Sequence, residues 1–163
     1  MKPSTLLELL REFYREKSAI RLRHVAGARL VGNYDFNNTY QYIINREDVH
    51  LAWIRDAITD LGGLPEDAPE PQIEAKGKDA EAGIIREDRD AVQAFVDRWR
   101  PRIEAITHAR NKTMLRVIIG EMLEQKRFFE QALAGREDLL GRSADGARTQ
   151  GSVMPTRWVG NRP

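Results

Sequence analysis

The sequence predicts an all-α protein built as a bundle of four long helices. Apolar residues recur at three- and four-residue spacing through four segments of the 163-residue chain, the pattern of a helix with one buried face. Two short connections and one long connection join these segments. This order is typical of two antiparallel hairpins joined by a crossover.

The first helix is predicted to begin at Ser4 or Thr5, because Thr5 and Glu8 have the spacing of a capping box. It is expected to end near Val31, before Gly32 and Asn33. Its apolar face consists of Leu6, Leu9, Leu10, Phe13, Ile20, Ala28 and Val31.

The second helix is predicted over residues 36–61, with Gly62 and Gly63 as its stop and Pro65 just beyond. Residues 65–83 are rich in proline and acidic side chains and end in glycine. A connection of this length can travel along the whole bundle rather than turn back as a hairpin.

The third helix is predicted to begin between Ile84 and Glu87, and Pro101 within its apolar stripe predicts a kink or a break. The fourth is predicted to begin between Thr107 and Thr113 and to stop at Gly135.

These elements divide the chain into two parts. Residues 1–135 form the predicted four-helix bundle domain, and residues 136–163, rich in Gly, Arg and Ser, form a predicted extended or disordered C-terminal arm.

The composition narrows the range of partners. The 26 Lys and Arg residues nearly balance the 25 Asp and Glu residues, so no overall field attracts nucleic acid or an anionic membrane. No apolar stretch approaches the length of about 18 residues that spans a bilayer, and the N-terminus has no signal-peptide core. We therefore expect a cytoplasmic protein with neither nucleic acid nor a membrane as partner. We also expect a homo-oligomer, a dimer.

A Glu47-x-x-His50 motif lies on the predicted second helix. Residues three positions apart project from one helical face about one turn apart, so both side chains can reach one metal ion. Glu47 falls within the apolar stripe, where a buried carboxylate requires compensation. Because the chain has no Cys, His and carboxylate groups are its strong metal ligands.

The first half of the chain resembles the ferritin-like superfamily, bacterioferritins and more loosely rubrerythrins. The resemblance lies in Glu16-x-x-Ala19-Ile20, in Glu47-x-x-His50 and in the Leu-x-Gly-Leu-Pro sequence that ends at Pro65. It implies a ferritin-like bundle whose interior binds iron or manganese and reacts with oxygen or peroxide. Glu16, Glu47 and His50 are the ligands that it implies.

The fourth helix departs from the family pattern. Met122 and Gln125 stand where that pattern has a glutamate and a histidine, and neither suits a hard metal. Glu121 is the best remaining candidate, since the helical wheel places Glu124 far from the apolar side. The predicted metal ligands are therefore Glu16, Glu47, His50 and Glu121, a partial site suited to one weakly held ion. Whether the protein is an enzyme stays open.

A metal-free alternative rests on Lys17. The helical wheel places Lys17 and His24 nearer than Glu16 to the centre of the first helix's apolar face. A buried Lys17 could pair with Glu47, since both lie about midway along neighbouring antiparallel helices. His24 is interpreted as a core or interfacial histidine. In this alternative the chain has no cofactor and acts as a scaffold or interaction module.

Overall fold

The computed structural model describes residues 3–74 and 79–140, and within them the chain is all-helical. The four helices are α1 (Pro3–Ala28), α2 (Tyr34–Asp60), α3 (Ala80–Glu104) and α4 (Ala109–Leu133). The predicted all-α four-helix bundle is confirmed. Residues 136–140 follow α4 without helix, and the rest of the predicted C-terminal arm lies outside the described residues.

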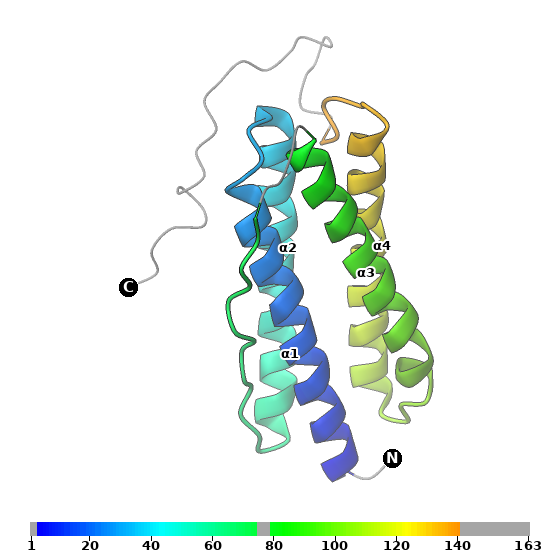
Figure 1. Cartoon of the computed structure of the whole chain (residues 1–163). Coiled ribbons are helices and arrows are strands. Elements are labelled where there is room, and N and C mark those ends of the chain that lie inside the picture. Colours follow the sequence, from blue (N-terminus) through cyan, green and yellow to red (C-terminus); the bar gives the residue numbers. More distant parts are fainter. Residues whose placement is uncertain (1–2, 75–78, 141–163) are drawn as a thin grey trace.

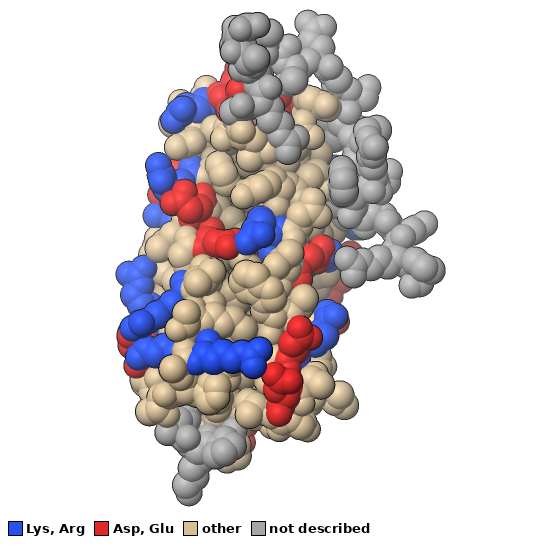
Figure 2. Space-filling view, turned by 180° about the vertical axis from the view of Figure 1, so that it is seen from behind, with Lys and Arg blue, Asp and Glu red and all other residues tan. Residues whose placement is uncertain are grey.

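The helices form two antiparallel hairpins, α1 with α2 and α3 with α4 (Figure 1). Across the hairpins, the packed pairs in the described part of the chain are α1 with α3 and α2 with α4, which leaves α1 and α4 on one diagonal. From the side of α2 and α4, the surface has uncharged areas that are interrupted by a red and a blue side chain near the middle and by a charged group across the lower part (Figure 2). None of the described helices combines the length and the apolarity needed to cross a membrane.

The long connection after α2 runs back along the first hairpin (Figure 1). The Tyr14 hydroxyl of α1 donates to Asp67 Oδ1 over 2.7 Å, and the Ala68 amide donates to Ser18 Oγ over 3.2 Å. These contacts attach the connection to α1. Hydrogen bonds with Tyr14 and Ser18 of α1 therefore hold the predicted crossover against the bundle.

The first two helix boundaries differ from the predicted ones by a few residues. The helix α1 ends at Ala28 rather than near Val31, and Asn37 Nδ2 donates to the Ala28 carbonyl over 2.7 Å. The helix α2 begins at Tyr34, because Asn33 Oδ1 accepts the Phe36 amide and satisfies a free donor of the first turn. Its end is as expected, with Gly62 in the left-handed region at a φ of 75°.

The third helix is longer than predicted at its start and is not broken within. It begins at Ala80, and Glu81 in its first turn accepts the Gly32 amide over 2.8 Å. It continues through Pro101 to Glu104, so the helix does not break at Pro101, and the alternative of a kink there stays a prediction. Pro101 lies in the last turn, where the ring removes one hydrogen bond near the helix end rather than from its middle.

The core contains two aromatic clusters, one nearer each end of the bundle, and several buried charged side chains. Phe13 of α1 packs edge-on against Phe95 and Trp99 of α3, with ring centroids 5.0 and 4.9 Å away. Toward the other end, the rings of Tyr40 and Phe129 lie 5.6 Å apart. The interior also contains fully buried charged or titratable side chains, namely Lys17, His24, Glu47, His50 and Asp88.

Candidate functional site

The carboxylate of Glu47 is the centre of the buried polar cluster. Its side chain projects from α2 into the bundle and is 0% exposed. The Lys17 ammonium of α1 pairs with Oε1, and His24 Nδ1, also from α1, lies 2.9 Å from Oε2. The predicted Lys17–Glu47 ion pair is therefore confirmed, and both carboxylate oxygens have partners from the facing helix.

The electrostatics of this cluster favour the ionised carboxylate. Burial by itself raises the pKa of Glu47, but the charges of His24 and Lys17 outweigh it and lower the pKa to about 2. For Lys17, burial lowers the pKa of the ammonium against the opposing effect of Glu47. The two charges thus stabilise each other where neither is solvated.

The other predicted ligand on α1, Glu16, has its partners on α3. Its Oε2 accepts the Trp99 indole N–H over 2.7 Å, and its Oε1 lies 2.9 Å from the Arg98 guanidinium. Glu16 and Glu47 therefore have different partners on different neighbouring helices. Arg98 also places a positive charge beside the Glu16 carboxylate, and this charge repels a cation that would bind there.

His50 and Glu121 are brought together between α2 and α4. His50 Nε2 lies 2.9 Å from Glu121 Oε2, and the Arg46 guanidinium binds both oxygens of the same carboxylate over 2.6 to 2.9 Å. Burial, followed by the charge of Lys17, lowers the pKa of His50 to about 4. His50 is therefore neutral at neutral pH and pairs with a carboxylate that Arg46 already compensates.

Of the four predicted ligands, His50 and Glu121 contact each other, whereas Glu16 and Glu47 have separate partners. In the described residues, no group of three or more His, Asp or Glu side chains is arranged to hold an ion. An ammonium group contacts Glu47, and guanidinium groups contact Glu16 and Glu121, so each carboxylate already faces a cation. On α4, Met122 and Gln125 are buried at the core positions, as predicted, and Glu124 is exposed.

A second buried carboxylate, Asp88 of α3, was not among the predicted site residues. It is 0% exposed and accepts the Tyr40 hydroxyl over 2.5 Å and Arg23 Nε over 2.6 Å. Burial, and then Asp88, raise the pKa of Tyr40 well above its ordinary value, so the hydroxyl stays a donor. The detectable signal was a charged residue on an apolar face, the same signal that identified Lys17.

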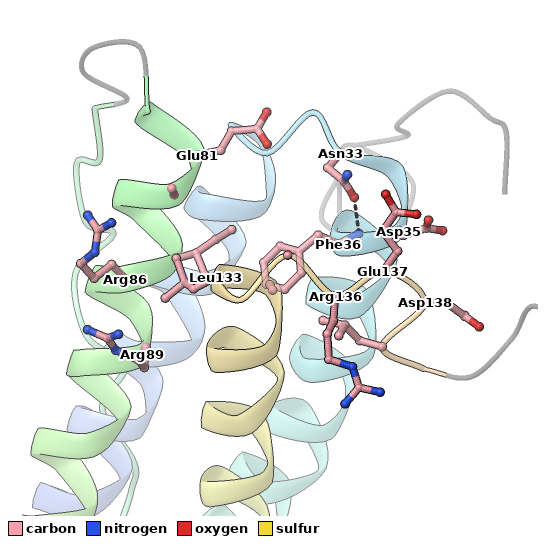
Figure 3. Close-up of a pocket in the computed structure, with 15 residues that line it drawn as sticks. Asn33, Asp35, Phe36, Glu81, Arg86, Arg89, Leu133, Arg136, Glu137 and Asp138 are labelled. Atoms are coloured by element: carbon pink, nitrogen blue, oxygen red, sulfur yellow. Dashed lines mark hydrogen bonds between the residues drawn. The ribbon is translucent and has the colours of Figure 1, made fainter. Parts of the chain in front are cut away.

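An open hollow at one end of the bundle lies away from this cluster (Figure 3). Phe36 and Leu133 face its middle, with Arg86 and Arg89 of α3 on one side and Glu137 and Asp138 on the other. It contains none of the predicted ligands. Because both acidic and basic side chains line the hollow, it favours neither an anionic nor a cationic ligand.

The buried His50 predicts a specific pH dependence of stability. Its pKa is about 4 in the folded chain against 6.5 ordinarily, so between these values the unfolded chain binds a proton that the folded chain does not. Stability is therefore lost as the pH falls from 6.5 toward 4. Denaturant unfolding near pH 7 and near pH 5 should show that this loss is about 2 kcal/mol larger for the wild type than for His50→Gln. Equal losses in the two proteins would contradict the low pKa of His50.

Fold and interior together define an all-α four-helix bundle with a charged, mutually compensated core. No family model, curated protein or solved structure matches this chain.

Proposed function

We propose that this protein is a metal-independent four-helix interaction module of ferritin-like topology that works as a homodimer. One observation carries the metal-independent part of the proposal: Glu47, the residue best placed to be a metal ligand, has one oxygen on Lys17 and the other on His24. An ammonium group in contact with a carboxylate repels a divalent cation from the same position. The interior then serves stability, and the function lies on the surface.

A second candidate function is the binding of iron or manganese in metal or oxidant handling. His50 and Glu121 support it, since they supply one imidazole and one carboxylate 2.9 Å apart, and His50 Nδ1 has no hydrogen-bond partner among the described residues. Two ligands favour at most a weakly held ion. Arg46 on the same carboxylate weighs against this candidate.

Metal content and metal-dependent stability separate the two candidates. The full chain, purified from cells grown in iron- and manganese-rich medium, should carry substoichiometric metal by elemental analysis. Its thermal midpoint should not rise when Mn²⁺ or anaerobic Fe²⁺ is added. A metal ion that bound the folded state alone would raise that midpoint. A chelator-treated sample is the control. One metal ion per chain, or a midpoint that increases with metal concentration, would refute the metal-independent function.

A further inference from the structure

The side of the bundle formed by α2 and α4 exposes apolar side chains. Four of the six large hydrophobic residues exposed in the described part lie there, each 36% to 44% exposed: Tyr42, Val49, Trp53 and Val117. The other two, Leu30 and Leu64, lie in connections between helices. The helix α2 thus carries a second apolar stripe besides its core stripe, which is typical of a helix covered on two sides.

Two rows of four residues make up this surface, which we call the α2–α4 face. The rows are Tyr42, Arg46, Val49 and Trp53 on α2, and Val117, Glu121, Glu124 and Phe128 on α4. In both rows the residues follow at steps of four, three and four, so each row keeps to one side of its helix. The rows run antiparallel in register: the Tyr42 and Phe128 rings lie 6.0 Å apart, and Arg46 binds Glu121.

We propose that the α2–α4 face is where a second copy of the chain docks, with α2 of each copy lying on α4 of the other. The proposal rests on the proposed function in taking the partner to be the same chain. A closed dimer uses one patch on both copies, so the patch must be complementary to itself. Figure 2 shows this side of the molecule, where uncharged areas lie above and below a few central charged side chains.

The charges on the face favour docking of α2 on α4 over the other two-fold symmetric arrangement, in which like helices meet. The only charged residue of the α2 row is Arg46, whereas the α4 row carries Glu121 and Glu124. With the two-fold axis along the helices, α2 of one copy covers α4 of the other at the same height, and Arg46 meets the partner copy's acidic row. With the axis across the helices, α4 lies on α4 and glutamate meets glutamate. Like charges facing each other at an interface are unfavourable.

Gln125 supplies an independent observation. Its side chain is 2% exposed, and neither its amide nitrogen nor its amide oxygen has a partner among the described residues. It lines the groove between the rows, beside Tyr42, Arg46 and Phe128. A buried amide without partners is costly, and docking places the exposed Asn45 of the second copy at about this height. An amide can both donate to and accept from another amide.

Substitutions of Val49 test the arrangement, because in the proposed dimer Val49 faces the partner copy's Glu121. Sedimentation equilibrium on the full chain should show a dimer for the wild type. Val49→Glu should weaken it roughly tenfold or more, and Val49→Lys should weaken it much less. Leu64→Glu introduces the same charge at an exposed apolar residue off the face and should leave the dimer intact. Circular dichroism confirms that each variant is folded.

Each of the other possible sedimentation results would refute a different part of the proposal. Stronger loss with Val49→Lys than with Val49→Glu would place Val49 against Arg46 and refute the docking of α2 on α4. A dimer unaffected by both substitutions would refute the α2–α4 face and leave the proposed function standing. A monomeric wild type would refute the homodimer itself. Gln125→Leu should weaken the dimer without destabilising the monomer, and an unchanged dimer would refute the role of Gln125.

Discussion

Replacing Lys17 by methionine should lower the free energy of unfolding by about 3–5 kcal/mol, the usual result of leaving one charge of a buried pair without its partner. Methionine keeps much of the unbranched stem, so the change removes the ammonium group with little loss of packing. Glu47 then retains only His24. Denaturant unfolding near pH 7 measures the effect.

Two further proteins control this experiment. Lys126→Met removes an ammonium group from a pair on the α4 surface, with Glu130, and should cost no more than about 0.5 kcal/mol. Lys17→Met with Glu47→Met removes both buried charges and should recover much of the lost stability, since apolar replacements of buried pairs are often neutral. If Lys17→Met costs no more than Lys126→Met, the buried ion pair does not stabilise the fold.

Replacing Asp88 by alanine should cost about 3 kcal/mol, because the buried Tyr40 hydroxyl and the Arg23 guanidinium lose a common acceptor. Tyr40→Phe removes only one hydrogen bond from this group and should cost about 1 kcal/mol. The matched control is Asp90→Ala, since Asp90 lies two residues further on α3 with an exposed side chain. Similar losses for Asp88→Ala and Asp90→Ala would contradict the role assigned to the buried carboxylate.

Much of the fold follows from local patterns in the sequence. The three- and four-residue spacing of apolar residues locates all four helices, and the length of the proline-rich segment separates a crossover from a hairpin. Helix ends are less predictable, because partners distant in sequence help determine them. The carbonyl of Ala28 is capped by Asn37 from the next helix, and Glu81 of α3 accepts the amide of Gly32.

The sequence predicts those parts of the candidate site that depend on which face of a single helix is buried. Lys17 and Glu47 each fall on an apolar face, and a buried charge requires an opposite one. The orientation of Glu16 depended on a different neighbour: Trp99, far along the chain, supplies a buried N–H that requires an acceptor. Such pairings depend on how helices rotate against each other, which the periodicity of a single helix does not specify.

The double attachment of Glu47 also limits the routes by which this lineage can change its interior by mutation. Loss of Lys17 leaves a buried carboxylate with a single partner, and loss of Glu47 leaves a buried ammonium group. Either single step is expected to cost a large part of the roughly 5–15 kcal/mol that holds a typical domain folded. A variant that acquires a metal site here must therefore replace Lys17 and supply new ligands almost together, so the buried pair opposes a stepwise change.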